Sequence, residues 1–402
     1  MNRLGGAFGL GAGVTTAALA FGSRPLGVAG VGLLLAATSA RAWAGLIQGP
    51  LSVDLRPEPS PASEGDRVRL MIVARRTSRV PVGSFVVRGL LGRLGAYECR
   101  LRGHGRTATG ELDLGRLPRG NYLLSEARIV LGDFLGLESV ARPIDPVGAS
   151  VVVYPRLVAL QGLFSDAGRL GGDGRRLLLR RPAGFDFHSV REYEQGESLR
   201  RVHWPTSARR GQLMVKELED APRDAVVVLL DCDPAGAVGE PPESSFDTSV
   251  RAAGSVLRGY AERGRTATLV TTGANPGVVR VRSVEVDLRA ALSALAAAEP
   301  DAPYALTRSL GREGSPAARA GELVVVTATL EPAALTALAG LATRRLVSVV
   351  WIDAPSFAGR PTRAAPGVLR LAAEGIPVAV VRCNHDLTAA LDRSRSKAAA
   401  HA

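Results

Sequence analysis

Two apolar runs at the start of the chain constrain its fold more than any other feature. The first covers residues 5–22 and the second residues 26–40, and neither contains a charged side chain. Each is just long enough to cross the roughly 30 Å hydrocarbon core of a bilayer as a helix. Both are rich in Gly and Ala, and the Gly-rich residues 9–13 offer a small-residue face at which two helices pack closely. The sequence therefore predicts a transmembrane helical hairpin over residues 1–48.

The arginines around these runs predict the side of the membrane. Arg3 precedes the first run, Arg24 lies in the turn, and the arginines that follow the second run are Arg41, Arg56, Arg67 and Arg69. Because positive charges favour the cytoplasmic side, we expect both ends of the hairpin, and the soluble domains, on the cytoplasmic face of the plasma membrane. The alternative is a secretory signal peptide with a cleavage-like site at residues 18–20, which would make the chain a secreted β-sandwich protein of the envelope. The second apolar run favours the hairpin.

Charge and cysteine usage narrow the function classes. The chain has 50 Lys and Arg residues against 38 Asp and Glu residues, a formal net charge of +12. This balance suits anionic lipid. Nucleic acid is not expected as a partner, since no basic cluster is interleaved with stacking aromatic residues. Cys99, Cys232 and Cys383 lie far apart and without metal-ligand spacing, so neither a zinc site nor a disulfide framework is predicted.

The region from residue 49 to residue 162 has the pattern of a β domain. Short runs of alternating apolar and polar residues are separated by turn residues. The predicted strands are residues 51–55, 67–76, 83–91, 96–103, 107–115, 121–131 and 149–155. Such spacing is typical of an antiparallel β-sandwich of about seven strands.

The pattern changes over residues 221–402, where apolar runs alternate with helical segments. The predicted strands are residues 225–231, 266–272, 322–328, 346–353 and 376–381, and the predicted helices lie near residues 246–263, 287–298, 332–343 and beyond 385. Continuous apolar strands between helices indicate a mostly parallel, Rossmann-like α/β sheet covered on both faces. Ligands bind such sheets at the carboxyl ends of the strands, which places Asp231, Thr327 and Thr329 on the candidate functional edge.

The densest set of unusual residues lies between residues 184 and 219. They are Arg191, Glu192, Tyr193, Gly196, Arg200, Arg201, Trp204, Ser207 and Arg209. In this order and spacing they resemble the signature of the bacterial family known as domain of unknown function 58, with Glu197 in place of the usual Asp. The resemblance implies two N-terminal membrane helices, a β-rich domain and a von Willebrand factor A-like α/β domain. It also implies frequent association with MoxR-type AAA+ ATPases.

The signature segment, residues 163–220, is expected to form a β-rich insert packed on the α/β domain. The expected order is a strand over residues 187–193, a helix from Ser198 to Arg209 with Ser198 as its N-cap, and a returning strand over residues 212–219. On that helix Arg200 and Trp204 are four residues apart, so their side chains would share a face and stack. Three roles stay open for the segment, namely a structural link to the α/β domain, a docking surface and catalysis.

The resemblance implies a place for a divalent cation. Von Willebrand A-like domains hold one through D-x-S-x-S after the first strand, with a Thr and an Asp from two further loops, because hard cations prefer oxygen ligands. The matching positions are Asp231, Asp233 and Ala235, and Ala235 has no ligand atom. The loop expected to supply the Asp carries Thr327 and Thr329 instead, and the remaining Thr has no assigned position. We predict a degenerate site without a bound metal or other cofactor, and Mg²⁺ stays open as the ion that the site would hold if one binds.

Enzymatic alternatives have less support in the sequence. A Ser-His-Asp set of Ser207, His203 and Asp186 lacks the G-x-S-x-G turn. Cys232, at the end of a buried strand, is more typical of packing than of a nucleophile. The leading prediction is a non-enzymatic, membrane-anchored scaffold that binds lipid through its hairpin and a protein partner, by resemblance a MoxR-type ATPase. The alternative is a hydrolase or metal-dependent enzyme that acts at the strand-end edge near Asp231.

Overall fold

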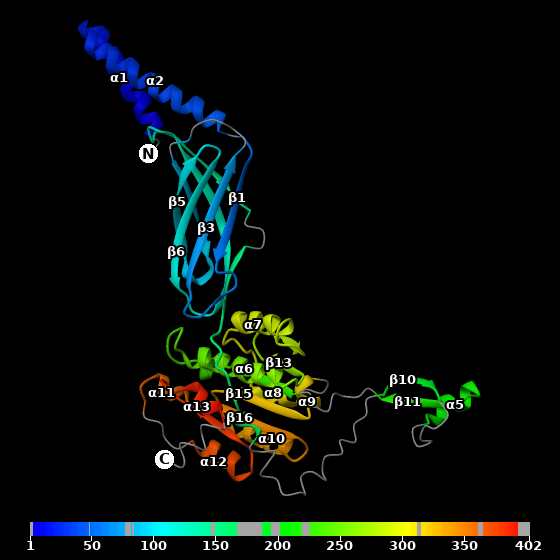
Figure 1. The fold of residues 1–402 in the computed structure, drawn as a ribbon. Coiled ribbons are helices and arrows are strands. Elements are labelled where there is room, and N and C mark those ends of the chain that lie inside the picture. The colour runs from blue at the N-terminus through cyan, green and yellow to red at the C-terminus, as the bar shows by residue number, and fades with distance from the viewer. Residues whose placement is uncertain are drawn as a thin grey trace. The chain divides into compact units, whose positions relative to one another are not determined.

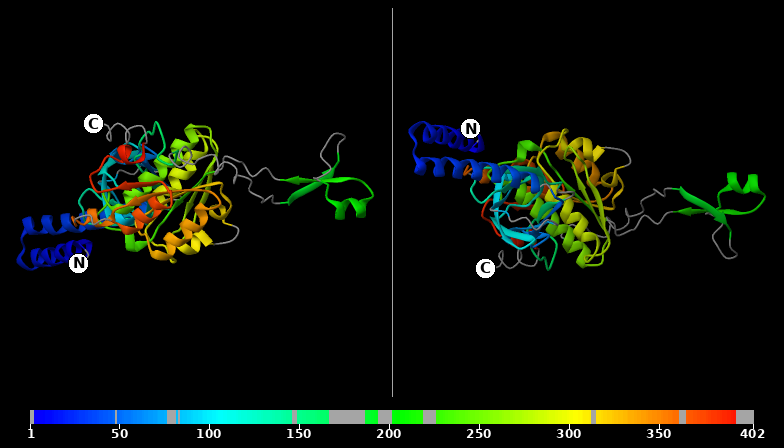
Figure 2. Two further views of the ribbon diagram at one scale, coloured as in Figure 1. Left: turned by 90° about the horizontal axis from the view of Figure 1, so that it is seen from below. Right: turned by 90° about the horizontal axis from the view of Figure 1, so that it is seen from above.

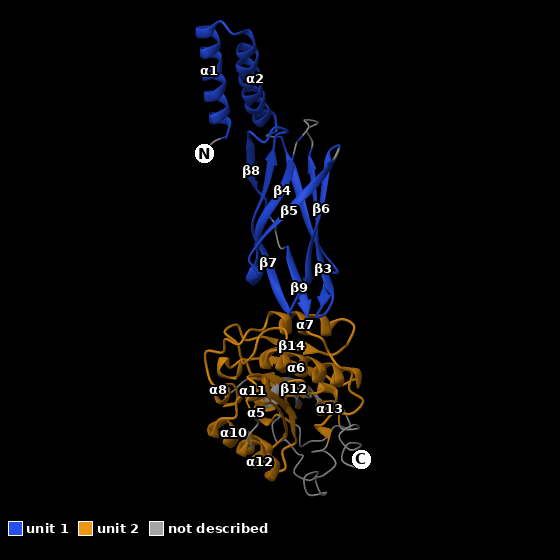
Figure 3. Ribbon diagram, turned by 90° about the vertical axis from the view of Figure 1, so that its left-hand side faces the viewer, with its two compact units in different colours: residues 1–154 blue, residues 155–402 orange. Residues whose placement is uncertain are grey.

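The computed structural model of the chain (Figure 1) describes residues 3–47, 49–76, 82, 84–145, 149–166, 187–193, 202–218, 226–311, 315–360 and 365–392. At residues 104, 187–192, 215–218 and 319 it describes the backbone alone. The chain divides into two compact units, Met1–Tyr154 and Pro155–Ala402 (Figure 3).

The first unit begins with a hairpin of two helices, α1 (Arg3–Phe21) and α2 (Arg24–Leu46). Pro25 stands in the first turn of α2, where its missing amide proton costs no helical hydrogen bond. Both helices are long and apolar enough to cross a membrane, by length and composition. The two predicted helices are therefore present, while the side of the membrane on which their ends lie stays a prediction.

Small residues let the two helices approach each other. A Cβ atom added at Gly11 would lie 3.1 Å from Leu34, and one added at Gly30 would overlap the hydroxyl oxygen of Thr15. The other glycines of residues 9–13 have nothing within 4 Å of an added Cβ. Of the predicted small-residue face, only Gly11 of α1 contacts the other helix closely. Gly30 is the corresponding close contact on α2.

A β-rich domain follows, with nine strands among its described residues. They are β1 (Leu51–Glu58), β2 (Ala62–Ser63), β3 (Arg67–Arg76), β4 (Ser84–Leu91), β5 (Ala96–His104), β6 (Thr107–Arg116), β7 (Gly120–Gly132), β8 (Ser139–Pro143) and β9 (Ser150–Tyr154). Hydrogen bonds join them in the order β1-β3-β6-β5-β4-β7-β9-β2, and β8 pairs with β7. Each predicted strand has a counterpart, and β2 and β8 are additions. Because β2 pairs with β9 in parallel, the expectation of a purely antiparallel domain is wrong at this edge.

Alternation of buried and exposed residues builds the core of this domain. In β7, Tyr122 and Leu124 are buried, and after a shift of one position Ala127 and Ile129 are buried. The shift coincides with Glu126, whose φ is 49°, and with a change in register between β4 and β7. A bulge of this kind lets a long strand keep one face on the core while it bends.

The second unit contains a sheet of six strands. They are β12 (Val226–Leu230), β13 (Ala267–Thr271), β14 (Val278–Val281), β15 (Glu322–Thr327), β16 (Leu346–Ile352) and β17 (Val378–Val381). Their order is β14-β13-β12-β15-β16-β17, and all pairs are parallel except β13 with β14. The predicted strands are present, and β14 was not predicted.

Helices cover both faces of this sheet (Figure 2). The first face carries α6 (Ser245–Glu262), α7 (Asp287–Ala297) and α13 (Leu387–Leu391), which share a core with Val226, Val228 and Leu230. The second face carries α8 (Leu306–Gly311), α9 (Pro316–Arg319), α10 (Pro332–Ala342) and α12 (Pro366–Ala373), which share a core with Val227 and Leu229. Because alternate residues of β12 enter the two cores, a continuous apolar run suits this strand. The helices that were not predicted, α8, α9, α11 (Ala354–Phe357) and α12, are all short.

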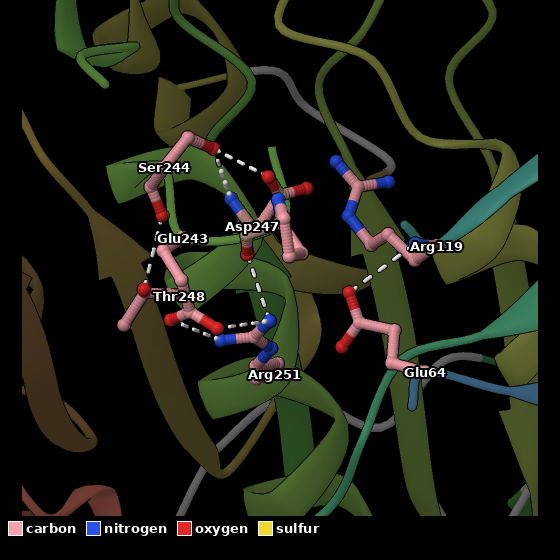
Figure 4. Close-up of polar contacts among 8 residues, drawn as sticks. Glu64, Arg119, Glu243, Ser244, Asp247, Thr248 and Arg251 are labelled. Carbon is pink, nitrogen blue, oxygen red and sulfur yellow. Dashed lines mark hydrogen bonds and ion pairs between the residues drawn. The ribbon is translucent and has the colours of Figure 1, made fainter. Parts of the chain in front are cut away.

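The N-terminus of α6 is closed by polar side chains (Figure 4). The hydroxyl oxygen of Ser244 accepts a hydrogen bond from the backbone N–H of Asp247 at 3.0 Å, and the hydroxyl donates to the Asp247 carboxylate at 2.6 Å. One turn later Arg251 forms an ion pair with Glu243 at 3.0 Å. The cap satisfies amide protons that a helix leaves without intrahelical partners, so α6 begins at a defined residue directly after the β12 loop.

The signature segment contributes a small piece of β structure. Strands β10 (Phe187–Glu192) and β11 (Met214–Leu218) pair antiparallel, as predicted, and α5 (Trp204–Arg210) lies between them in sequence. The prediction of a helix from Ser198 is wrong at its start, because α5 begins at Trp204 with His203 as its N-cap. Pro205 explains the difference, since proline is tolerated in the first turn of a helix but not in its interior. Arg200, which was expected to stack on Trp204, lies outside the described residues.

Candidate functional site

The candidate site lies at the carboxyl ends of the central strands β12 and β15. The chain leaves β12 for α6 on one face of the sheet, and it leaves β15 for α10 on the other face. Neighbouring parallel strands whose connections diverge in this way form the switch point at which α/β sheets bind ligands. Asp231 directly follows β12, and Thr327 is the last residue of β15.

Asp231 is buried, and threonine hydroxyls surround its carboxylate. The Thr327 hydroxyl donates to Oδ2 at 2.7 Å, and the Thr329 hydroxyl lies 3.4 Å from the same oxygen. The Thr272 hydroxyl lies 3.4 Å from Oδ1. The structure thus brings together Asp231, Thr327 and Thr329, which the sequence placed on one edge.

Asp233 completes the group. Its Oδ2 accepts the Thr329 hydroxyl at 3.1 Å, and its Oδ1 accepts the backbone N–H of Ala235 at 2.9 Å. That second bond caps the short 3-10 turn Pro234–Gly236. Both oxygens of Asp233 therefore have donors inside the domain, and Ala235 presents only a methyl group to solvent.

The Thr327 side chain also shapes its own loop. Its hydroxyl oxygen accepts the backbone N–H of Thr329 at 3.0 Å and lies 2.7 Å from the backbone oxygen of Thr329. A hydroxyl has one proton, so it donates either to this oxygen or to Asp231 at a given moment. The turn after β15 is therefore held by the same atom that contacts Asp231.

Burial sets the electrostatics of the two residues that end β12. Burial raises the pKa of Asp231 above its ordinary value, and the hydrogen bond from Thr327 opposes that shift. Burial also raises the pKa of the Cys232 thiol to about 11, so this sulfur is protonated at neutral pH. Since the thiolate is the reactive form, the geometry does not favour Cys232 as a nucleophile.

Two residues of this edge were missed by the sequence analysis. Thr272 follows β13, and its hydroxyl oxygen also accepts the backbone N–H of Cys232 at 2.9 Å. Its position at the end of a predicted apolar strand was the signal that could have found it. Asp301 lies in the loop after α7. The backbone N–H of Ala302 in this loop donates a hydrogen bond of 2.9 Å to the Cys232 carbonyl, which holds the loop at the same edge. No sequence pattern marks that loop.

The donor set is the kind that would hold Mg²⁺ if a cation bound, because it consists of carboxylate and hydroxyl oxygens. Asp231, Asp233, Thr327 and Thr329 would be its ligands. Within the described part of the chain, however, no three His, Cys, Asp or Glu side chains gather as a metal site. In this structure the threonine hydroxyls lie within hydrogen-bond distance of the carboxylates, so the same oxygens contact one another directly.

The signature residues are only partly described. Gly196, Glu197, Arg200 and Arg201 lie outside the described residues, and at Arg191 and Glu192 only the backbone is described, within β10. The residues with described side chains are Tyr193, which is half-buried, Ser207, which is buried, and Trp204 and Arg209, which are exposed. The structure leaves the roles predicted for the segment as predictions.

The side chains of Ser207 and His203 make local contacts at the start of α5. The Ser207 hydroxyl oxygen accepts the backbone N–H of Met214 at 2.9 Å, and the hydroxyl lies 3.0 Å from the backbone oxygen of His203. The His203 ring nitrogen Nδ1 is 2.7 Å from the Thr206 hydroxyl. Ser207 therefore ties α5 to β11, and Asp186, the third member of the set considered, lies outside the described residues.

Known proteins resemble this chain across the region just described. Residues 189–359 match the family model described as Protein of unknown function DUF58. The match runs from β10 past β16 and includes Asp231, Asp233, Thr327 and Thr329. The "Uncharacterized protein YeaD" of Bacillus subtilis (strain 168) is 27% identical over 276 residues, which are 66% of this chain and 67% of that protein.

Among solved structures, Cwp6 from Clostridium difficile aligns with 75% of this chain and 37% of its own length. The alignment has 8% sequence identity and a TM-score of 0.22. The DUF58 match overlaps the signature segment and agrees with the resemblance noted there.

Proposed function

We propose that this chain is a non-enzymatic, membrane-anchored interaction protein that docks a protein partner at the strand-end edge of a von Willebrand A-like domain. The observation that carries the proposal is the hydrogen-bond cluster around Asp231. Its buried carboxylate accepts the Thr327 hydroxyl at 2.7 Å and has two further hydroxyls at 3.4 Å. Buried polar groups are stable when they have such partners, so the burial of Asp231 requires no cation.

The topology of the sheet supports the von Willebrand A-like assignment. Five strands are parallel, the edge strand β14 is antiparallel, and helices cover both faces. The central strand β12 carries the acidic residue at its carboxyl end, where that fold would place its metal motif. The assignment rests on this arrangement together with the DUF58 match.

The residues around the cluster suit contact with a protein. Pro234, Ala235 and Ala237 are exposed beside Asp233. In the loop that the Ala302 bond brings to this edge, Tyr304 is 55% exposed, and the Arg308 guanidinium lies 3.7 Å from the centre of its ring. Tyr and Arg are enriched among the residues that dominate the energy of protein interfaces. The exposed small apolar residues and the Tyr304–Arg308 pair around the Asp231 cluster therefore suit a protein docking surface.

The partner proposed from the family resemblance is a MoxR-type AAA+ ATPase. Such a partner requires the soluble units to lie on the cytoplasmic side, as the distribution of arginines around the hairpin predicts. The hairpin would then hold the chain at the membrane, where the ATPase would bind it.

Affinity capture of the full-length chain from its native membrane tests the proposal. A Trp at the exposed Ala235 (Ala235→Trp) would block the edge sterically, and Thr336→Trp on the exposed face of α10 is the matched control. We expect a AAA+ ATPase to be captured by the wild type and by Thr336→Trp and to be lost with Ala235→Trp. Equal capture by all three chains would contradict docking at this edge, and loss of a protein of another class would contradict the partner.

A second function, a metal-dependent hydrolase, is favoured by the oxygen-rich composition of the same cluster. Two carboxylates and three threonine hydroxyls meet at a switch point, which is the usual location of an α/β active site. Calorimetric titration of the full-length protein with Mg²⁺ separates the two functions. Saturable binding that disappears in Asp231→Ala would favour the enzyme over the scaffold.

A further inference from the structure

The turn between β7 and β8 holds two large apolar side chains in solvent. Phe134 is 67% exposed and Leu135 is 61% exposed. Two hydrogen bonds fix the turn. Asp133 Oδ1 accepts the backbone N–H of Leu137 at 2.9 Å, and the backbone N–H of Asp133 donates to the backbone oxygen of Glu138 at 3.2 Å. Adjacent exposed apolar residues on a defined turn are characteristic of an interaction site.

The turn lies next to the end of the second apolar helix (Figure 3). Arg41 of α2 pairs with Glu138 at 3.6 Å, and Arg142 of β8 donates to the backbone oxygen of Gly49 at 2.7 Å. Ile47 is buried in the core of the β-rich domain, and Trp43 packs against that core. The last turn of α2 is therefore attached to the domain at the β7–β8 end.

Arg41 marks the level at which α2 would leave the bilayer. Residues 25–40 contain no charged side chain, and Arg41 is the first one after Arg24. Charged side chains at the end of a membrane helix lie at the level of the lipid headgroups. Since Glu138 contacts Arg41, the neighbouring Phe134 and Leu135 lie in the turn at the same level.

We propose that residues 133–138 form a second membrane contact, in which Phe134 and Leu135 enter the interfacial region of the bilayer beside α2. Aromatic and aliphatic side chains gain stability there by leaving water. The proposal rests on the membrane anchor of the proposed function and extends it from the hairpin to the β-rich domain. Two attachments instead of one would restrict the tilt of that domain on the membrane.

Fluorescence quenching of the full-length protein in vesicles of phosphatidylcholine and phosphatidylglycerol tests the proposal. The background is Cys383→Ser, because Cys99 and Cys232 are buried. An environment-sensitive probe is attached in turn to Leu135→Cys, Leu35→Cys and Arg116→Cys. Leu35 is an exposed residue within α2. Arg116 is exposed. In the sheet it lies opposite Arg67, the first residue of β3, whereas Leu51, which comes soon after α2, lies opposite Arg76, the last residue of β3.

Lipids with a nitroxide near the headgroup should quench the probe at residue 135 several-fold more than the probe at residue 116. Aqueous iodide should show the reverse order, and the probe at residue 35 should be quenched by lipid. If lipid quenches the probe at residue 35 but quenches the probes at residues 135 and 116 equally, the second membrane contact is refuted and the membrane anchor is retained. If the probe at residue 135 is shielded from iodide but is not quenched by lipid, the second membrane contact is refuted and residue 135 contacts protein instead. Absence of lipid quenching at residue 35 would overturn the anchor, and the second contact with it.

Discussion

At the scale of single residues, Thr327 determines the arrangement around Asp231. We expect Thr327→Val to remove its hydroxyl donor and to lower the free energy of unfolding of the second unit by about 1–3 kcal/mol, because a buried carboxylate loses a partner. Thr336→Val, which removes an exposed hydroxyl on α10, is the control and should cost much less. Urea unfolding followed by the fluorescence of Trp351 in β16, with Trp43 and Trp204 replaced by Phe, measures the difference. Equal midpoints for the two variants would contradict the role of Thr327.

The cysteines give a second prediction at this scale. With a pKa of about 11, Cys232 has about one thiolate per thousand molecules at pH 8, and its side chain is buried. We expect a thiol reagent to modify Cys383, which is partly exposed, well before Cys232 and Cys99 in the native protein. The raised pKa means that the rate of Cys232 modification should keep rising up to about pH 11 and should not level off near pH 9, as it does for an ordinary thiol. Rapid native modification of Cys232 at pH 8, located by peptide mapping, would restore it as a candidate nucleophile.

The sequence predicts part of this site for a simple physical reason. Asp231, Thr327 and Thr329 follow long apolar strands, and the ends of parallel strands meet at one edge. Thr272 follows β13, another apolar strand, so the same rule could have predicted its place at this edge. Asp301 was not, because its loop is placed by a backbone bond between Ala302 and Cys232 that no local pattern encodes.

At the scale of elements, the packing of α1 on α2 depends on Gly30. A larger residue there would overlap Thr15, whereas nothing lies within 4 Å of a Cβ at Gly32. We expect Gly30→Leu to destabilise the hairpin by about 1–3 kcal/mol and Gly32→Leu to leave it unchanged. Spin labels at the exposed Leu10 and Leu35 report the helix separation by dipolar spectroscopy. A broader and longer distance distribution in Gly30→Leu alone is expected, and identical distributions in both variants would contradict this packing.

The elements also show where prediction from sequence ends. Long periodic segments such as α6 and the apolar β12 were predictable, because burial on one or two faces dictates their pattern. The edge strands β2, β8 and β14 are short and carry little periodicity. The start of α5 is set by Pro205 in its first turn, and the polar residues before it do not extend the helix to Ser198.

At the scale of the whole molecule, the protein should not depend on a divalent cation. Ligands that bind only the folded state stabilise it in proportion to the logarithm of their concentration. Because the carboxylates of Asp231 and Asp233 already have threonine hydroxyls as partners, we expect millimolar Mg²⁺ and EDTA to give the same Trp351 unfolding midpoint. A rise in the midpoint with Mg²⁺ that is absent in Asp231→Asn would show that the cluster opens to bind the ion.

Docking of a protein partner at the strand-end edge without a cation can be examined by site-specific photo-crosslinking from residue 235 of the full-length chain, in native membranes with and without EDTA. We expect a discrete crosslink to one protein that persists in EDTA and is absent when the probe is moved to residue 336. A crosslink that EDTA abolishes, or the same products from both positions, would contradict it.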